Sequence, residues 1–497
     1  MAGNRSRTPL LPTFHKRLFG RPPVKSVSRL IHEQFDELGY FALERLKDLF
    51  GACLPANVLR IDKQAGGKGA NSREAILTPA VTFWGFLSQV LSPGSSCREA
   101  LAKIQVLCAS QKQKAPSSDT SVYCKARRRL EMKDLQSIQQ HSAQRLEANT
   151  PSGDLWKERR TLLADATTVS MPDTPENQEC WPQSSNQAEG CGFPSMTMVG
   201  LFSLASSALM GVAKSTLNAN ESGLLYKLKE LFRSGDVLVG DRIYCSYVNI
   251  NWLLALGVDV VFRKNQSRNS EKCRTKTLGH NDRLVYWKKP LSRPAHAGLT
   301  RQLWKTLVQT ICVREINFRV EQKGFRSREL TIITTLLDPV QYPAEELAEL
   351  YLKRWRIELW FDDIKTSMQM DVLRCRKPKM IEKELVMHLI AYNMVRLVMQ
   401  AAALNHGQAP ESMSFKGTVD RIKQWAWSII FAHSANRRQQ MYDKLLESIA
   451  EDPVVTRPHR YEPRVVKRRA KAYDSMKKPR QQYRDEFYAA SAAIPNS

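Results

Sequence analysis

Four side chains in the C-terminal half of the chain have types and spacing that could act on a phosphate: Tyr351, Arg354, Glu358 and Lys365. They belong to a helical pattern that begins near Pro343. At about 100° per residue, they fall within roughly 60° of one another around the helix axis. One carboxylate is then held between a phenol, a guanidinium and an ammonium, which suits a site where a metal ion meets a phosphate. The alternative interpretation is a solvated helix with ion pairs three and four residues apart.

Two short apolar segments upstream each carry a further acid. Asp165 lies within residues 161–169, and Asp241 follows the run Val-Leu-Val-Gly that ends at Gly240. A continuous apolar run bounded by glycine is typical of a central parallel strand, and glycine there allows a backbone or a substrate to approach closely. We expect two strands, each carrying one acid, and a helix whose apolar stripe faces the core. The residues of that stripe are Ile357, Trp360, Phe361 and Ile364.

The spacing Tyr-x2-Arg-x3-Glu-x6-Lys resembles the YREK signature of the insertion sequence 4 family of bacterial transposases, and the resemblance extends over roughly residues 79–480. It implies that Asp165, Asp241 and Glu358 form a catalytic, metal-binding Asp-Asp-Glu triad. It also implies a ribonuclease H-like core, in which the first and fourth strands lie side by side. Asp362 lies one turn beyond Glu358 and is a rival third ligand, although the signature spacing favours Glu358. Two other rivals, Asp173 and Asp236, have the positions of turn or capping residues.

Three carboxylates suit phosphodiester chemistry, because two divalent ions about 3.5–4 Å apart can serve the attacking and the leaving oxygen. Hard oxygen ligands select Mg²⁺, with Mn²⁺ as a substitute. We expect two ions per site, with Asp165 bridging both while Asp241 and Glu358 each complete one.

The resemblance also implies roles for the basic residues of the site. Tyr351, Arg354 and Lys365 would hold the DNA backbone near the cut, and Arg242 would contact the same strand. A bidentate grip is expected of the arginine and a point charge of the lysine. Hydrolysis at a transposon end would free a 3′-hydroxyl that attacks target DNA, through a hairpin intermediate that the family associates with a β-rich insertion.

The charge balance favours a polyanionic partner. The chain of 497 residues carries 75 Lys and Arg against 49 Asp and Glu, a formal charge of +26, which favours double-stranded DNA and makes binding salt-dependent. A membrane is disfavoured because the sequence has no run of about 18 apolar residues. The N-terminus shows no secretory signal, and the ten cysteines include no CxxC pair, which argues against a zinc module or a disulfide framework. We expect a bacterial cytoplasmic protein associated with the nucleoid.

The length predicts several units in a multidomain α/β protein. Its ribonuclease H-like mixed sheet is flanked by helices and joined by a β-rich insertion, an N-terminal helical DNA-binding region and a C-terminal helical region. We expect an N-terminal basic and helical segment (1–75) and a helical DNA-binding domain (76–154). The core follows in two parts, 155–265 and 329–377 with Glu358, on either side of the β-rich insertion (266–328). The C-terminal helices (378–450) and a basic tail (451–497) complete the chain as given.

Three further sets of residues are candidate DNA contacts. A helix that follows good N-cap residues near Asp119 resembles the last helix of a helix-turn-helix-like unit, although a solvated face is the alternative. In the tail, a basic run is expected to follow duplex phosphates, although such runs are often only solvated. Two tryptophans of the insertion could stack on an unpaired base or simply pack the insertion. The basic residues of the helix are Lys125, Arg127, Arg128 and Arg129, and those of the tail are Lys467, Arg468 and Arg469. The two tryptophans of the insertion are Trp287 and Trp304.

Two other functions fit parts of this pattern. A nuclease with the same core would cut DNA without joining it, and a catalytically idle DNA-binding protein would do neither. An RNA-binding role fits the charge but leaves the carboxylates unexplained. Because two DNA ends must be joined to one target, we expect a homodimer in the complex with terminal inverted repeats and target DNA.

Overall fold

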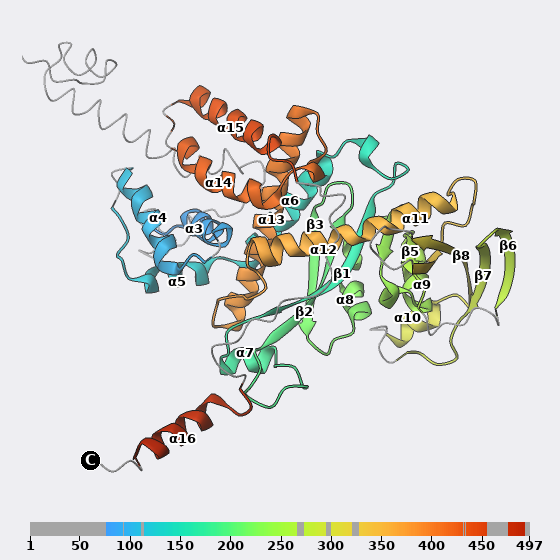
Figure 1. The fold of residues 1–497 in the computed structure, drawn as a ribbon, viewed down its shortest axis with the longest axis horizontal. Helices are drawn as coiled ribbons and strands as arrows, with labels where there is room; N and C mark the ends of the chain where they lie inside the picture. Colours follow the sequence, from blue (N-terminus) through green and yellow to red (C-terminus); the bar gives the residue numbers. More distant parts are fainter. Residues whose placement is uncertain are drawn as a thin grey trace, which may run out of the picture.

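A computed structural model of the chain describes residues 76–92, 94–110, 114–265, 273–294, 300–320, 328–430, 432, 434–454 and 476–492 (Figure 1). The predicted N-terminal segment, residues 1–75, lies outside the described residues. So do the three basic residues of the tail that were predicted to contact DNA: Lys467, Arg468 and Arg469.

The N-terminal part is helical, as predicted. Helices α3 (Pro79–Leu91) and α4 (Cys97–Ser110) are separated where the sequence has proline and glycine, and Gly94 has a φ of +88°. Helix α5 (Thr120–Arg129) begins at the N-cap Asp119, whose carboxylate accepts from the Ser121 N–H at 2.8 Å. A longer helix, α6 (Met132–Ala148), then packs against the C-terminal helix α13.

The sheet has nine strands in the order β3-β2-β1-β4-β5-β9-β8-β7-β6. Strands β1, β2 and β3 are antiparallel, whereas β4 and β5 run parallel to β1. This is the predicted ribonuclease H-like arrangement, with the first and fourth strands side by side. The bounds of these five strands are β1 (Thr161–Ser170), β2 (Ser195–Ser203), β3 (Leu209–Thr216), β4 (Val237–Gly240) and β5 (Asp259–Arg263).

The predicted β-rich insertion continues this sheet. Strand β9 pairs with both β5 and β8, so the outer strands extend the core sheet rather than forming a separate one. Strand β8 is continuous from Thr310 to Val320, and its pairing with β9 runs without a break through Asn317. The outer strands are β6 (Arg274–Gly279), β7 (Asp282–Lys288), β8 (Thr310–Val320) and β9 (Arg328–Thr334), with a short helix, α10 (Arg301–Thr306), before β8.

A buried ion pair ties the insertion to the core. The Arg314 guanidinium, on β8, lies 2.5 Å from Asp282 on β7 and donates to the Tyr342 carbonyl at 2.7 Å. Tyr342 comes directly before the helical segment that carries Glu358. A charge buried this deeply needs such partners, so the pair fixes the insertion against the start of that segment.

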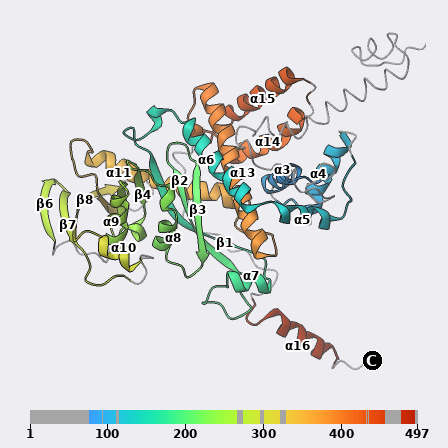
Figure 2. The same cartoon turned by 180° about the vertical axis from the view of Figure 1, so that it is seen from behind.

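Helices cover both faces of the sheet (Figures 1 and 2). On one face, α8 (Glu221–Lys227) and α9 (Tyr247–Ala255) share a hydrophobic core with Leu162 and Leu238. On the other, the segment with α11 (Ala344–Leu352) and α12 (Arg356–Asp362) packs over alternate residues of the same strands, Leu163 and Val239. Side chains two residues apart on a strand share a face, so this second face is the one that Asp165 belongs to.

The C-terminal helices are α13 (Pro378–His406), α14 (Phe415–Ile430) and α15 (Ala435–Ala450). Among the described helices, α13 alone is long and apolar enough to span a membrane, and 83% of its apolar window is buried inside the protein. It contacts α3, α6, α14 and α15, as the core helix of the C-terminal region. Within the predicted basic tail, residues 480–492 form a further helix, α16 (Arg480–Ala492), that the sequence pattern did not indicate.

Candidate functional site

The two aspartates lie at neighbouring positions of two adjacent parallel strands: Asp165 is on β1, and Asp241 directly follows the last residue of β4. Ala164 of β1 pairs with Gly240 of β4, and each acid is the next residue along its chain. Adjacent strands are about 4.8 Å apart, so the two residues that directly precede Asp165 and Asp241 lie about this close together. A side chain at Gly240 would crowd Tyr244 at 3.0 Å and Phe262 at 3.1 Å, which explains glycine at the end of β4.

The glutamate reaches these strands because its helix sits close to the sheet. The Phe361 ring of α12 packs directly over Gly200 of β2, where an added Cβ would lie 2.9 Å from the ring. Gly200 is the register partner of Asp165. The predicted unbroken helix is interrupted, because a 3₁₀ turn (Lys353–Trp355) joins α11 to α12 and a π turn (Asp363–Ser367) follows. Irregular turns of this kind recur at functional sites.

Arg354 joins two of the three predicted triad members. Its Nη1 donates to Asp165 Oδ2 at 3.0 Å, and its Nη2 donates to Glu358 Oε1 at 2.9 Å. The Arg354 side chain is 8% exposed, against 23% for Asp165 and 54% for Glu358. The guanidinium therefore lies beneath a carboxylate that opens to solvent.

The other two residues of the YREK pattern border the same place. Lys365 Nζ donates to Thr167 Oγ1 at 3.2 Å, two residues beyond Asp165 on the same face of β1. The Tyr351 ring is buried, and burial raises the pKa of its phenol to about 12, with the charge of Asp241 adding to the effect while Arg354 opposes it. Tyr351 therefore stays protonated at neutral pH and lies behind Arg354.

The acids influence one another's protonation. Burial raises the pKa of Asp165, and the negative charges of Asp241 and Glu358 raise it further, whereas the Ala166 N–H and Arg354 oppose the rise. Glu221, the first residue of α8, was not identified from the sequence. Burial raises the pKa of the Glu221 carboxyl, and so do the charges of Asp165 and Asp241. A fourth carboxylate therefore borders the site, and its isolated position before a short helix gave no sequence signal.

The donor set suits a hard divalent cation in kind, because all three predicted ligands are carboxylates. Across the described ranges, however, no group of three or more His, Cys, Asp and Glu side chains lies close enough together to hold one metal ion. The Arg354 guanidinium stands between Asp165 and Glu358. Asp165, Asp241 and Glu358 could hold a metal once that guanidinium has moved.

The rival acids are engaged elsewhere. Asp362 accepts from the Thr366 hydroxyl at 2.6 Å and is exposed. Asp236 is buried and forms an ion pair with Arg160 at 2.6 Å. Asp173 accepts from the Gln178 amide at 2.8 Å. Each of the three has a local partner that a capping or structural role explains.

One of the four basic residues predicted to contact DNA from helix α5 does not face solvent. Lys125, Arg128 and Arg129 are exposed as predicted for DNA contacts, but Arg127 is buried. Its guanidinium donates to Gln89 and lies over the Phe86 and Tyr123 rings. Arg127 is thus not open to a phosphate, because neighbouring helices enclose it.

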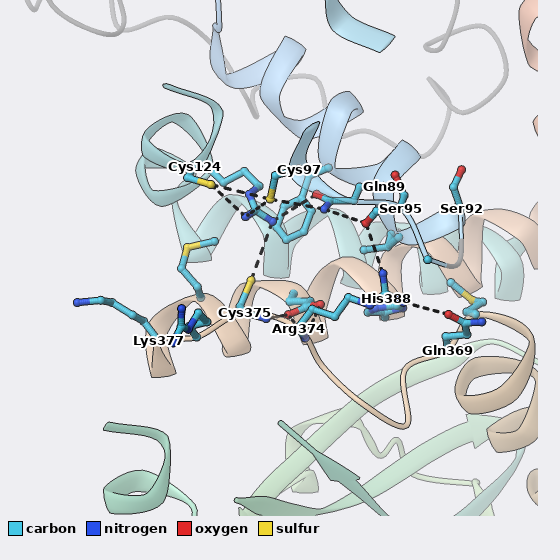
Figure 3. A pocket seen from close by; sticks show the side chains of 18 of the residues that line it. Gln89, Ser92, Ser95, Cys97, Cys124, Gln369, Arg374, Cys375, Lys377 and His388 are labelled. Atoms are coloured by element: carbon cyan, nitrogen blue, oxygen red, sulfur yellow. Dashed lines mark hydrogen bonds between the residues drawn. The ribbon is translucent and has the colours of Figure 1, made fainter. Parts of the chain in front are cut away.

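The place that Arg127 fills is a pocket between the N-terminal helices and α13 (Figure 3). Its Nη2 donates to Cys97 at 3.2 Å and to Cys124 at 3.7 Å, and its Nη1 lies 4.0 Å from Cys375. In Figure 3, Cys97 and Cys124 lie on one side of the pocket and Cys375 lies on the other. Arg127 therefore links the N-terminal domain to the segment that follows the Glu358 helix.

The remaining residues predicted to contact DNA are one arginine and two tryptophans. Arg242 is exposed in the 3₁₀ turn directly after Asp241, beside the site. Trp287 is fully buried within the insertion, so no face of its indole is open to a base. Trp304 is half-buried under the Lys289 ammonium, 4.8 Å from its ring centroid. Packing accounts for Trp287, and base stacking stays a prediction for Trp304.

Comparison with known proteins bears on the same residues. Residues 156–394 match the family described as the transposase DDE domain, a span that includes all three acids. The chain is 28% identical over 367 residues to the transposase InsG for insertion sequence element IS4 of Escherichia coli (strain K12), covering 73% of this chain and 79% of that protein. A stretch of 69 residues is 30% identical to the transposase for insertion sequence element IS421 of Escherichia coli, covering 14% of this chain and 19% of that protein. A cryo-EM structure of a piggyBac transposase synaptic complex with hairpin DNA is similar with a TM-score of 0.38 and 8% identity, covering 83% of this chain and 85% of that chain.

Proposed function

We propose that the chain is a DDE transposase of the insertion sequence 4 family, which its similarity to the transposase DDE domain and to InsG supports. In this proposal it binds the terminal inverted repeats of an insertion sequence, cuts at both ends and joins the freed 3′-hydroxyls to target DNA. The observation that carries this proposal is the convergence of three carboxylates from distant segments. Asp165 lies on β1, Asp241 directly follows the paired strand β4, and Arg354 ties Asp165 to Glu358.

The three acids are the proposed ligands for two Mg²⁺ ions, which Mn²⁺ can replace. When bound, such ions activate the attacking oxygen and stabilise the leaving one. Asp165 would be the ligand that both ions share, because its carboxylate is close enough to interact with both Asp241, directly after β4, and Glu358 of α12. The Asp165 side chain is partly buried on the sheet, which limits its movement. Asp241 and Glu358 are therefore positioned relative to a fixed carboxylate.

The surrounding residues are proposed to hold the scissile strand. Lys365 offers an ammonium beside β1, and Arg242 offers an exposed guanidinium directly after Asp241. Tyr351 keeps its proton at neutral pH, and its phenol oxygen can accept a hydrogen bond from the neighbouring Arg354 guanidinium. In the N-terminal domain, the exposed residues Lys125, Arg128 and Arg129 of α5 are the proposed contacts to the transposon end.

Several features of the assembly belong to the same proposal. A homodimer would bring two DNA ends to one target, in the cytoplasm of a bacterium and in association with its nucleoid. A hairpin at the excised ends is the proposed second-strand route. The charge of +26 supports a DNA partner, since such an excess favours phosphate binding.

The experiment that tests this function uses the three conservative variants Asp165→Asn, Asp241→Asn and Glu358→Gln. Each should abolish Mg²⁺-dependent cleavage of a duplex that ends in the element's inverted repeat, while binding to that duplex survives. Asp362→Asn serves as the matched control and should keep its activity. Full activity in a triad variant would remove that residue from the site, and cleavage without joints to a target plasmid would favour the nuclease alternative.

A further inference from the structure

Arg354 is engaged by the residues that the proposed function assigns to the metal ions. Its two terminal nitrogens contact Asp165 and Glu358 at 3.0 and 2.9 Å. A lone pair of a carboxylate oxygen that accepts a hydrogen bond from the guanidinium cannot at the same time bind a metal ion. The absence of a metal-ready group among the described residues agrees with this, because the guanidinium holds two of the acids around itself.

We propose that Arg354 is an internal counter-ion of the triad, which occupies the metal site of the free protein and leaves it when metal and DNA bind. This rests on the proposed function, since it assumes that Asp165 and Glu358 are metal ligands. In the free protein the guanidinium offsets the repulsion among Asp165, Asp241 and Glu358 and holds Glu358 of α12 against β1.

The position of Arg354 makes its departure depend on a second anion. The side chain is only 8% exposed, and a buried charge without a partner is costly. Once metal takes its carboxylates, the guanidinium needs another anion within reach, and the phosphate of the DNA strand at the site is of the right chemistry for a bidentate arginine. Metal and DNA should therefore favour each other's binding, and linkage makes that effect reciprocal.

Other cations of the segment do not share this arrangement. Arg356, two residues further on, forms an ion pair with Glu411 at 2.6 Å, and both side chains are 36% exposed. It carries the same charge at the start of α12, directly after the turn that holds Arg354, but its ion pair is with Glu411 and not with one of the three acids. Arg356→Gln is therefore a matched control for Arg354→Gln, while Arg354→Lys keeps the charge without the two-pronged geometry.

The test is calorimetric titration of the full-length protein with Mn²⁺ alone, which needs no catalysis. Arg354→Gln should bind Mn²⁺ about tenfold more tightly than the wild type, because a unit charge within a few ångström of the ions is gone. Arg356→Gln should stay within about twofold of the wild type. Arg354→Lys should fall between them. Thermal unfolding in the absence of metal checks that each variant is folded. Added Mn²⁺ should raise the midpoint temperature of unfolding more for Arg354→Gln than for the wild type.

The second arm measures the linkage. In the presence of an inverted-repeat duplex that lacks its 3′-hydroxyl, the wild type should bind Mn²⁺ about 5- to 150-fold more tightly than without DNA. Arg354→Gln should lose most of that gain. A folded Arg354→Gln that binds Mn²⁺ no more tightly than the wild type overturns the counter-ion role alone. A wild type that binds no Mn²⁺ with or without DNA overturns the proposed function itself.

Discussion

Gly200 offers a direct test of how the Glu358 helix is seated. In Gly200→Ala the new Cβ would lie 2.9 Å from ring atoms of both Phe202 and Phe361. Both rings are buried, and they pack edge to face at 5.2 Å, so neither can swing into free space. The helix α12 must therefore move away from β2 by some tenths of an ångström.

The expected cost is about 1–3 kcal/mol of unfolding free energy, as is usual for overpacking a well-filled core. Because a misplacement of about 1 Å can cost about 100-fold in rate, cleavage should fall by at least about tenfold. Urea unfolding measures the first quantity, and single-turnover cleavage of an inverted-repeat duplex measures the second.

Two further variants complete this test. Gly223→Ala is the control, because no atom lies within 4 Å of its added Cβ and it lies on helix α8; it should raise stability by about 0.5–1 kcal/mol. Phe361→Leu should relieve the clash, so that the double variant with Gly200→Ala shows a favourable coupling of at least about 0.5 kcal/mol. If Gly200→Ala were as stable and as active as the wild type, the close seating of α12 on β2 would be wrong.

Three other predictions follow from the site. Lys365→Ala should lower the salt slope of duplex binding by about one unit, and an unchanged slope would exclude the phosphate contact. Denaturing gels of excised products should show covalently closed ends, whereas open ends alone would indicate another second-strand route. Because the pKa of Asp165 is raised in the folded protein, protons compete at a higher pH than for a free aspartate, whose pKa is about 3.9. Mn²⁺ titrations over a pH series should therefore lose affinity, as the pH falls, at a higher pH than a free aspartate would, and a loss only at or below the pH at which a free aspartate takes up its proton would contradict this.

The parts of the site that depend on local sequence pattern could be predicted from the sequence. The apolar runs before Asp165 and Asp241 predicted two buried strands, and the helical spacing of Arg354, Glu358 and Lys365 predicted one face toward them. The structure has all three of these features. Strand alternation and helix periodicity depend on neighbours in the chain, so they can be found in a single sequence.

Contacts between distant segments could not be predicted in this way. Arg127 lies in a run of basic residues that indicates a solvated face, yet Phe86 and Gln89 of α3 and Cys375, just before α13, enclose it from two other segments. Glu221 gave no signal, because only the folded sheet brings α8 beside the acids. The interrupted helix at Lys353–Trp355 was missed for a related reason, since its residues form a 3₁₀ turn without any proline or glycine to mark it.

Anomalous diffraction from crystals of the protein with Mn²⁺ and an inverted-repeat duplex tests the central claim most directly. We expect ion peaks within about 2.0–2.2 Å of carboxylate oxygens from Asp165, Asp241 and Glu358, with Arg354 turned toward a DNA phosphate. Peaks bound by other acids, or a Glu358 that stays paired with Arg354 while metal is present, would contradict the assignment of these three residues to one catalytic site.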